Sequence, residues 1–437
     1  MHRRIRAARI PAVAGVALLA ALAATAGTTA ATAAPAPAPH PQPGQQVEYF
    51  TEPGGHPHHT TVPAPHTPAH PLLPWVKGDG KVTSVVNNGR VGDKLDVVFV
   101  GDGYTASQQN AFHAAVRAKW KKMTAVEPYA SYRNLFNVWA VDAVSHDSGV
   151  SGDPDQSVKR DTALGSGFFC DGVERLLCLD TAKVESYAAK APAADLVVVL
   201  SNSTKYGGAG YNDVVSKVGY DGIATASADN EKSDQIAVHE TGHSLGKLAD
   251  EYEYAEYGTY TGTEPATSNI STLGAAQMAD RRTKWYRWLG QTSPDGGTVG
   301  TYEGGGYYPK GLFRPTDNSI MRSLGREFNS PGREAMIAGF YRHAKVLSST
   351  RSAGTKVGRG ERLTVLPASA STTVRWYVDG HEVTAARGKT SLTPRSLGVR
   401  ADGRAHTVTV KAADRTSAVR DPELAKKLTG ELAWKVR

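Results

Sequence analysis

The 437-residue chain has only two cysteines and lacks long apolar runs beyond its N-terminus. After residue 33, no stretch approaches the roughly 18 apolar residues that a membrane-spanning helix needs, so we expect no membrane span. Dense basic runs are also missing: the four arginines of the first 33 residues account for half of the net charge of +8. This charge balance argues against nucleic-acid binding. There is no internal repeat.

Residues 1–33 have the pattern of a secretory signal peptide. Four arginines precede the short apolar run VAGVALLAALAAT, and Ala31-Thr32-Ala33 supplies an A-x-A cleavage site before Ala34. A membrane anchor is the weaker interpretation, because the run is too short and too rich in alanine to span a bilayer comfortably. We therefore expect the protein to be secreted and extracellular.

The two cysteines, Cys170 and Cys178, lie close together in FFCDGVERLLC. In an exported protein such a pair predicts a local disulfide that closes a small loop. The alternative, half of a metal site, lacks nearby ligands of the right type.

Residues 34–78 are rich in proline, alanine and histidine, a composition that cannot bury enough apolar surface to fold by itself. We predict a disordered spacer. Metal capture, or a removable pro-segment that covers the active site, is the alternative, because the segment contains six of the chain's fourteen histidines: His40, His56, His58, His59, His66 and His70.

Residues 79–348 alternate between patterns typical of strands and of helices, which predicts an α/β (α+β) domain with helices packed on a central mixed sheet. A glycine-rich stretch, YGGAGY at 206–211, follows the third buried strand; it is either an edge for an extended peptide substrate or an ordinary turn. The expected strands are 96–101, 136–144 and 195–201, and the expected helices are 106–124, 181–190 and 331–348.

Residues 349–437 contain short alternating runs separated by Asp-Gly turns (RLTVL, TTVRWYVDG, HTVTVKAAD and ELAWKVR). This pattern predicts a small C-terminal β-sandwich of the immunoglobulin-like type. Because the segment has no cluster of catalytic residue types, we expect it to contribute stability or contact with a cell surface or glycan.

The segment 236–251, IAVHETGHSLGKLADE, contains an H-E-x-x-H motif. On a helix, His239 and His243 lie on one face and can bind a single metal ion, with Glu240 beside them to activate a bound water. Ser233 or Asp234 is expected to cap the start of the helix. Gly246 is expected to end it in a left-handed conformation.

A catalytic zinc site needs a third protein ligand and one open position. Asp250 and Glu251 are the nearest candidates, and either could reach the metal if the chain turns back after Gly246. We prefer Asp250 as the ligand, with Glu251 as a hydrogen-bond partner of one of the histidines. Spacing alone leaves the reverse assignment open.

The stretch HETGHSLGKLADEY resembles the metal-binding signature of the M64 peptidases, metzincin-like zinc proteases named after an enzyme that cleaves immunoglobulin A. Further segments over residues 80–437 resemble family blocks: VVFVGDGYT, FNVWAVDAVSHDSGVS, DLVVVLSNSTKYGGAG, YEGGGYYPKGLFRPTDNSIMRSL and the ending ELAWKVR. The resemblance implies Zn²⁺ bound by His239, His243 and Asp250, with Glu240 as the general base. Where metzincins have their third histidine this chain has Ala249, and the acid comes one residue later.

Met321, in NSIMRS, resembles the Met-turn whose thioether lies beneath the two histidines; otherwise it is a plain core methionine. Together these features predict a secreted zinc-dependent endopeptidase acting on protein or peptide substrates. The donor that stabilises the tetrahedral intermediate stays open among Tyr307, Tyr308 and Arg322. The alternative is a non-catalytic protein that binds a surface or glycan on a peptidase-like scaffold.

Overall fold

The computed structural model describes residues 44–53, 55, 57–63 and 78–437. The predicted signal peptide and most histidines of the predicted spacer lie outside these residues.

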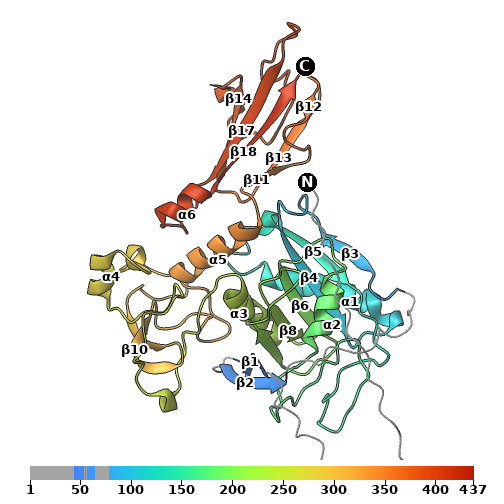
Figure 1. Cartoon of the computed structure of the whole chain (residues 1–437), viewed down its shortest axis with the longest axis vertical. Coiled ribbons are helices and arrows are strands. Elements are labelled where there is room, and N and C mark those ends of the chain that lie inside the picture. Colours follow the sequence, from blue (N-terminus) through green and yellow to red (C-terminus); the bar gives the residue numbers. More distant parts are fainter. Residues whose placement is uncertain (1–43, 54, 56, 64–77) are drawn as a thin grey trace, which may run out of the picture. The chain divides into compact units, whose positions relative to one another are not determined.

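An eight-stranded mixed sheet forms the centre of the fold, in the order β2-β1-β7-β8-β6-β4-β5-β3 (Figure 1). Its middle is parallel, and the outer strands pair antiparallel with it. This confirms the predicted central mixed sheet. The parallel strands are β4 (Leu95–Asp102), β5 (Phe136–Val141), β6 (Leu196–Ser201) and β8 (Ile223–Ser227); the outer strands include β3 (Val82–Val86) and β7 (Gly208–Tyr211).

Helices cover both faces of this sheet, which explains why its central strands are continuous apolar runs. In β4, Val97 and Phe99 face one core, and Val98 and Val100 face the other. The first core contains side chains of α1 (Gln109–Met123), α3 (Asp234–Ser244) and α5 (Ser330–His343), whereas the second contains side chains of α2 (Thr181–Ala188).

Two strands precede this domain and extend its sheet. β1 (Gly44–Phe50) and β2 (Pro57–Pro63) form an antiparallel hairpin, and β1 pairs with β7. This corrects the prediction of a disordered spacer for residues 44–50 and 57–63; residues 34–43 and 64–77 of that prediction lie outside the described residues. The strands form because Val47, Phe50 and Val62 are buried against the domain, so the hairpin obtains its apolar core from the sheet it joins.

The segment between α3 and α5 contains little regular structure: α4 (Ala275–Arg281) and the ribbon of β9 (Tyr302–Gly305) and β10 (Tyr308–Arg314). It has its own small core of Leu273, Met278, Trp285, Trp288 and Val299. Its aromatic residues therefore serve partly as a local core.

The C-terminal residues form two sheets that share one core, as expected for two packed β-layers. The immunoglobulin-like type stays a prediction. One sheet contains β11 (Leu347–Ser349), β13 (Leu363–Pro367) and β16 (Ser391–Leu392). The other contains β12 (Lys356–Val357), β18 (Thr429–Val436), β17 (His406–Asp414), β14 (Thr372–Val378) and β15 (His381–Glu382), and helix α6 (Pro422–Lys427) precedes β18.

The buried carboxylate of Asp414 ties these sheets to the preceding domain. It accepts hydrogen bonds from the hydroxyls of Tyr132, at 2.7 Å, and Tyr341, at 2.8 Å. The helix predicted for 331–348 ends at His343, because the chain then enters β11 of the C-terminal part.

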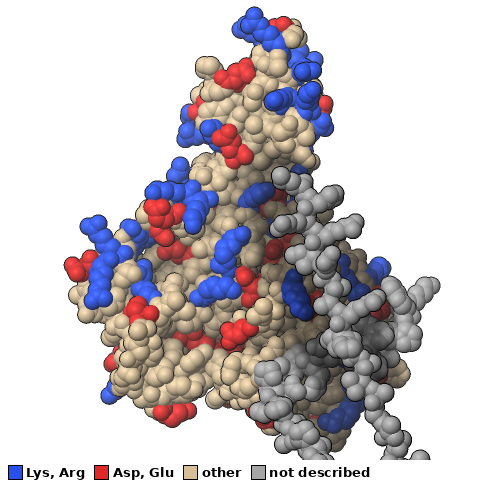
Figure 2. Space-filling view, viewed as in Figure 1, with Lys and Arg blue, Asp and Glu red and all other residues tan. Residues whose placement is uncertain are grey.

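The predicted disulfide between Cys170 and Cys178 is confirmed. In the described part of the chain, none of the helices is long and apolar enough to cross a membrane. On the face shown in Figure 2, basic and acidic side chains are interspersed, as expected from the modest net charge.

Candidate metal centre

Helix α3 carries the H-E-x-x-H motif and begins at Asp234, directly after a 3₁₀ turn. A 3₁₀ turn, Glu231–Ser233, leads into it, and the side chain of Asn230 accepts a hydrogen bond from the Lys232 amide at 3.0 Å. Ser233 occupies the predicted N-cap position of α3, but its side chain makes no capping hydrogen bond there. Asp234 instead forms an ion pair with the buried Lys119 of α1, which fixes the start of the helix.

The end of α3 also differs from the prediction. The helix stops at Ser244, and the left-handed residue is Lys247, with φ of 49°, not Gly246. Glycine is needed at 246 for close packing, because a Cβ there would lie 2.6 Å from the Gly242 carbonyl oxygen and 2.9 Å from the Met336 sulfur. The turn at Lys247 sends the chain back toward the histidines, as the third-ligand argument required.

Backbone carbonyls orient both histidines of α3. His239 Nδ1 lies 2.8 Å from the oxygen of Ile320, and His243 Nδ1 lies 2.7 Å from the oxygen of Leu248. Since a carbonyl only accepts, each Nδ1 is assigned the proton. The two Nε2 atoms, 3.0 Å apart, then present lone pairs to the same point.

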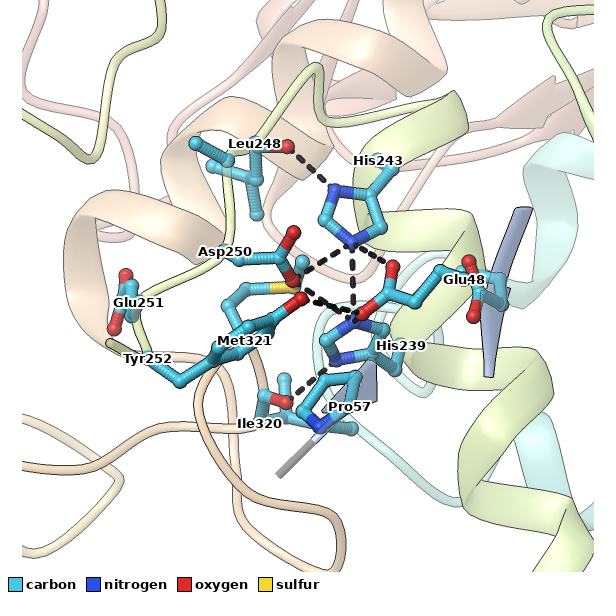
Figure 3. A network of polar contacts seen from close by, with 12 residues as sticks. Glu48, Pro57, His239, His243, Leu248, Asp250, Glu251, Tyr252, Ile320 and Met321 are labelled. Atoms are coloured by element: carbon cyan, nitrogen blue, oxygen red, sulfur yellow. Dashed lines mark hydrogen bonds and ion pairs between the residues drawn. The ribbon is translucent and has the colours of Figure 1, made fainter. Parts of the chain in front are cut away.

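Two carboxylates complete this cluster (Figure 3). Asp250 Oδ1 lies 3.4 Å from His239 Nε2 and 3.2 Å from His243 Nε2. Glu48, from β1, contributes Oε1 at 3.2 Å from His239 Nε2 and Oε2 at 3.0 Å from His243 Nε2. The ligand atoms of the four residues all lie within 4.8 Å of one another.

The chemistry of this donor set fits a metal ion. With neutral histidines, four groups with lone pairs surround one point, and Glu48 Oε2 and Asp250 Oδ1 are buried without a hydrogen-bond donor among the described residues. Atoms that bind one Zn²⁺ tetrahedrally lie about 3.4 Å apart, close to the separations seen here. Burial disfavours charge on His239, but the carboxylates of Glu48 and Asp250 outweigh it and raise the pKa of His239, as expected where two acidic groups face one point.

Glu251, the other candidate ligand, points away from this cluster. Its buried carboxylate accepts hydrogen bonds from Asn269, Ser319 and Asn329 at 2.7–3.1 Å. The prediction that Glu251 supports one of the histidines is thus wrong, because backbone carbonyls occupy both Nδ1 positions. Glu251 instead holds together the loops around the site.

Glu240 is fully buried beside the cluster, and its Oε1 has no hydrogen-bond partner in the described part of the chain. Asn212 donates to its Oε2 at 3.0 Å. Burial, aided by the nearby Glu48 carboxylate, raises the pKa of Glu240 to about 8. The carboxylate lies against Gly210 of β7, where a Cβ would be 1.6 Å from Oε2. Only glycine leaves room for it.

Met321 lies beneath α3, in the place expected for a Met-turn. A Cβ on Gly242 would come within 2.5 Å of its sulfur, and the Met321 carbonyl accepts the Glu251 amide at 2.8 Å. Figure 3 shows the thioether close to Asp250 and His239. Met321 therefore contacts α3 through its side chain and the loop that carries Asp250 through its backbone.

Of the three suggested donors to a reaction intermediate, Tyr307 is nearest to the site. Its hydroxyl donates to Asp250 Oδ2 at 2.8 Å. Arg322 forms an ion pair with Glu253 at 2.7 Å, and Tyr308 packs against the rings of Tyr257 and Tyr260.

Sequence reasoning assigned no role to three contributors to the site: Glu48, Asn212 and Tyr252, the last residue of HETGHSLGKLADEY. The Tyr252 hydroxyl donates to Glu48 Oε1 at 3.3 Å. A pocket of about 540 Å³ opens at the cluster, lined by the hairpin, β7 and the loop after α3; its walls include Glu48, His59, Gly210, His243, Asp250 and Tyr307.

A comparison with protein-family models identifies the family of the chain. Residues 83–297 and 292–340 match the model of the IgA peptidase M64 family, which covers more than half of the chain. The chain belongs to the M64 family. A comparison with curated protein sequences gave no significant match. The family is one of metallopeptidases, and the buried His, Glu and Asp cluster of this M64 chain is consistent with a metal site.

Proposed function

We propose that this M64 chain is a secreted, zinc-dependent endopeptidase that hydrolyses peptide bonds of protein substrates. The observation that carries the proposal is the convergence of His239, His243 and Asp250 on one point, next to the buried Glu240. Two imidazoles and one carboxylate form a known ligand set of catalytic zinc. Secretion rests on the N-terminal sequence pattern alone.

Zinc in this site would lower the pKa of a bound water and polarise the scissile carbonyl. Glu240 would accept the proton of the attacking water and pass it to the leaving amine. Asn212 holds one carboxylate oxygen of Glu240, which leaves Oε1 for the water. Tyr307 lies at the pocket wall and would donate to the developing oxyanion after turning its hydroxyl away from Asp250, to which it now donates.

The substrate would bind along β7. This strand pairs with β8 on one side and with β1 of the hairpin on the other, so it becomes a sheet edge when the hairpin is displaced. The carboxylate of Glu240 lies directly against it. An extended peptide that paired with β7 would bring its backbone past the metal and Glu240, in the manner of β-strand addition. Of the two interpretations of YGGAGY, the geometry favours the substrate edge.

Metal removal tests the proposal. Folded protein is expected to contain about one zinc ion per chain, and casein hydrolysis should stop with a chelator and return with zinc. Metal analysis and a casein assay measure this. Zinc content near zero in folded protein, or hydrolysis that survives complete zinc removal, would favour the non-catalytic binding protein instead.

The assignment of the third ligand gives a separate prediction. Asp250→Ala should weaken zinc retention by about 10-fold or more, because it removes a carboxylate that faces both imidazoles. Glu251→Ala should retain zinc better but lower the thermal stability, because it leaves Asn269, Ser319 and Asn329 without their acceptor. Competition with a chromogenic chelator, together with thermal unfolding, compares the two. The opposite order of zinc affinity would make Glu251 the ligand.

A further inference from the structure

The hairpin of β1 and β2 occupies the edge at which the substrate is proposed to bind. Glu48 pairs with Gly210 of β7, so β1 lies where an added peptide strand would lie. Phe50 is fully buried and packs edge-on against the ring of His239, with ring centroids 5.1 Å apart. The sheet edge beside Glu240 is thus covered by the chain itself.

Aromatic residues of the loops around the site hold the second strand of the hairpin. His59 Nε2 lies 2.6 Å from the Tyr252 hydroxyl and 3.6 Å from Asp250 Oδ2, and its ring contacts that of Tyr307. Tyr254 donates to the carbonyl of Pro57. Tyr252 and Tyr254 belong to the segment that supplies Asp250, and Tyr307 donates a hydrogen bond to Asp250. The hairpin is therefore docked onto the site rather than onto a remote surface.

Glu48 brings the number of metal-facing protein groups to four. Its side chain is only 2% exposed, and each carboxylate oxygen lies within 3.2 Å of a histidine Nε2. Catalytic zinc sites keep one position for water or substrate, whereas sites with four protein ligands are closed and structural. The hairpin therefore blocks two positions that catalysis needs: the open metal position and the strand beside which the substrate would bind.

We propose that the β1–β2 hairpin is an intramolecular inhibitor, and that the Glu48 carboxylate takes the metal position required by water or substrate. The inference rests on the proposed metallopeptidase function. Displacement of β1 from β7 would remove Glu48 and expose the strand edge together, because both belong to one strand. A peptide able to pair with β7 competes with the hairpin for the same place.

Full-length protein loaded with Co²⁺ tests this without an activity assay, because the visible spectrum of cobalt reports the ligands around it. Glu48→Gln keeps the size of the side chain but removes its charge, and Glu48→Ala removes the ligand. Both should change the spectrum and bind acetohydroxamate, a small chelating probe, at least about 10-fold more tightly than the wild type. Glu52→Ala, an exposed carboxylate beyond β1, should behave as the wild type.

The outcomes separate the two proposals. Cobalt bound at one ion per chain, with unchanged spectrum and hydroxamate affinity in both Glu48 variants, would overturn the inhibitor but leave the metallopeptidase intact. Loss of cobalt from both variants would make Glu48 an integral ligand of a structural site and would also overturn the inhibitor. A wild type that binds no cobalt would instead contradict the proposed metal site itself.

Discussion

Glu240→Gln is expected to lower kcat/KM for a peptide substrate by about 10²–10⁴-fold while zinc content stays unchanged. Glutamine keeps the size of the side chain and can still hydrogen-bond Asn212, but it cannot accept the proton of the attacking water. Because Glu240 is not one of the four groups that converge on the metal point, metal binding should survive. Steady-state kinetics and metal analysis measure the two effects separately.

Glu240→Gln is best introduced into both the wild-type and the Glu48→Gln chain. If the hairpin keeps wild-type activity low, the fall in kcat/KM is then still measurable in the Glu48→Gln background. Glu256→Gln is a matched control, since Glu256 is an exposed carboxylate in the short turn beside the pocket residue Tyr257. It should leave kinetics and zinc content unchanged. If the Glu240 variant retains full activity, Glu240 is not the general base.

The parts of the site that could be predicted from the sequence are those that depend on local spacing. His239 and His243 share a helix face because they are four residues apart, and the buried strands were recognisable from their β-branched runs. Asp250 was within reach because the chain turns back soon after the helix. The left-handed residue was predicted at Gly246 but is Lys247. Glycine is present at 246 because there is no space for a Cβ, not because the backbone needs a positive φ there.

Glu48 was missed because its role depends on a contact between distant segments. It lies 191 residues before His239, in a stretch whose overall composition predicted disorder. The local sequence QVEYF does alternate apolar and polar residues, but composition averaged over residues 34–78 concealed that short pattern. The hairpin becomes ordered only because Val47 and Phe50 find a ready-made apolar surface on the sheet.

The assignment of Glu251 failed for a different reason. Sequence spacing placed two adjacent carboxylates near the metal, but neighbouring residues in an extended segment point in opposite directions. Asp250 turns toward the histidines, so Glu251 must turn toward Asn269, Ser319 and Asn329. Those partners lie up to 78 residues away, beyond the reach of motif spacing.

Gly210→Ala is expected to reduce kcat/KM by about 100-fold or more with little loss of zinc. An added Cβ would lie 1.6 Å from Oε2 and 2.2 Å from Cδ of Glu240, so either the carboxylate or strand β7 must move. Displacement of a catalytic group by about 1 Å is enough for a loss of this size. Gly360→Ala is the control, because a Cβ at Gly360 meets nothing within 4 Å; kinetics, zinc content and thermal unfolding are measured for both.

A double-mutant cycle distinguishes displacement of Glu240 from general distortion of β7. If Gly210→Ala acts through Glu240, adding it to Glu240→Gln should cost little further activity, because the group that it displaces no longer accepts a proton. Gly208→Ala provides the comparison in the same strand: its Cβ would meet the Thr225 carbonyl oxygen at 2.5 Å, away from Glu240. If Gly210→Ala instead lowers kcat/KM in the Glu240→Gln background as much as in the wild type, and as much as Gly208→Ala does, then strand β7 rather than the general base is disturbed.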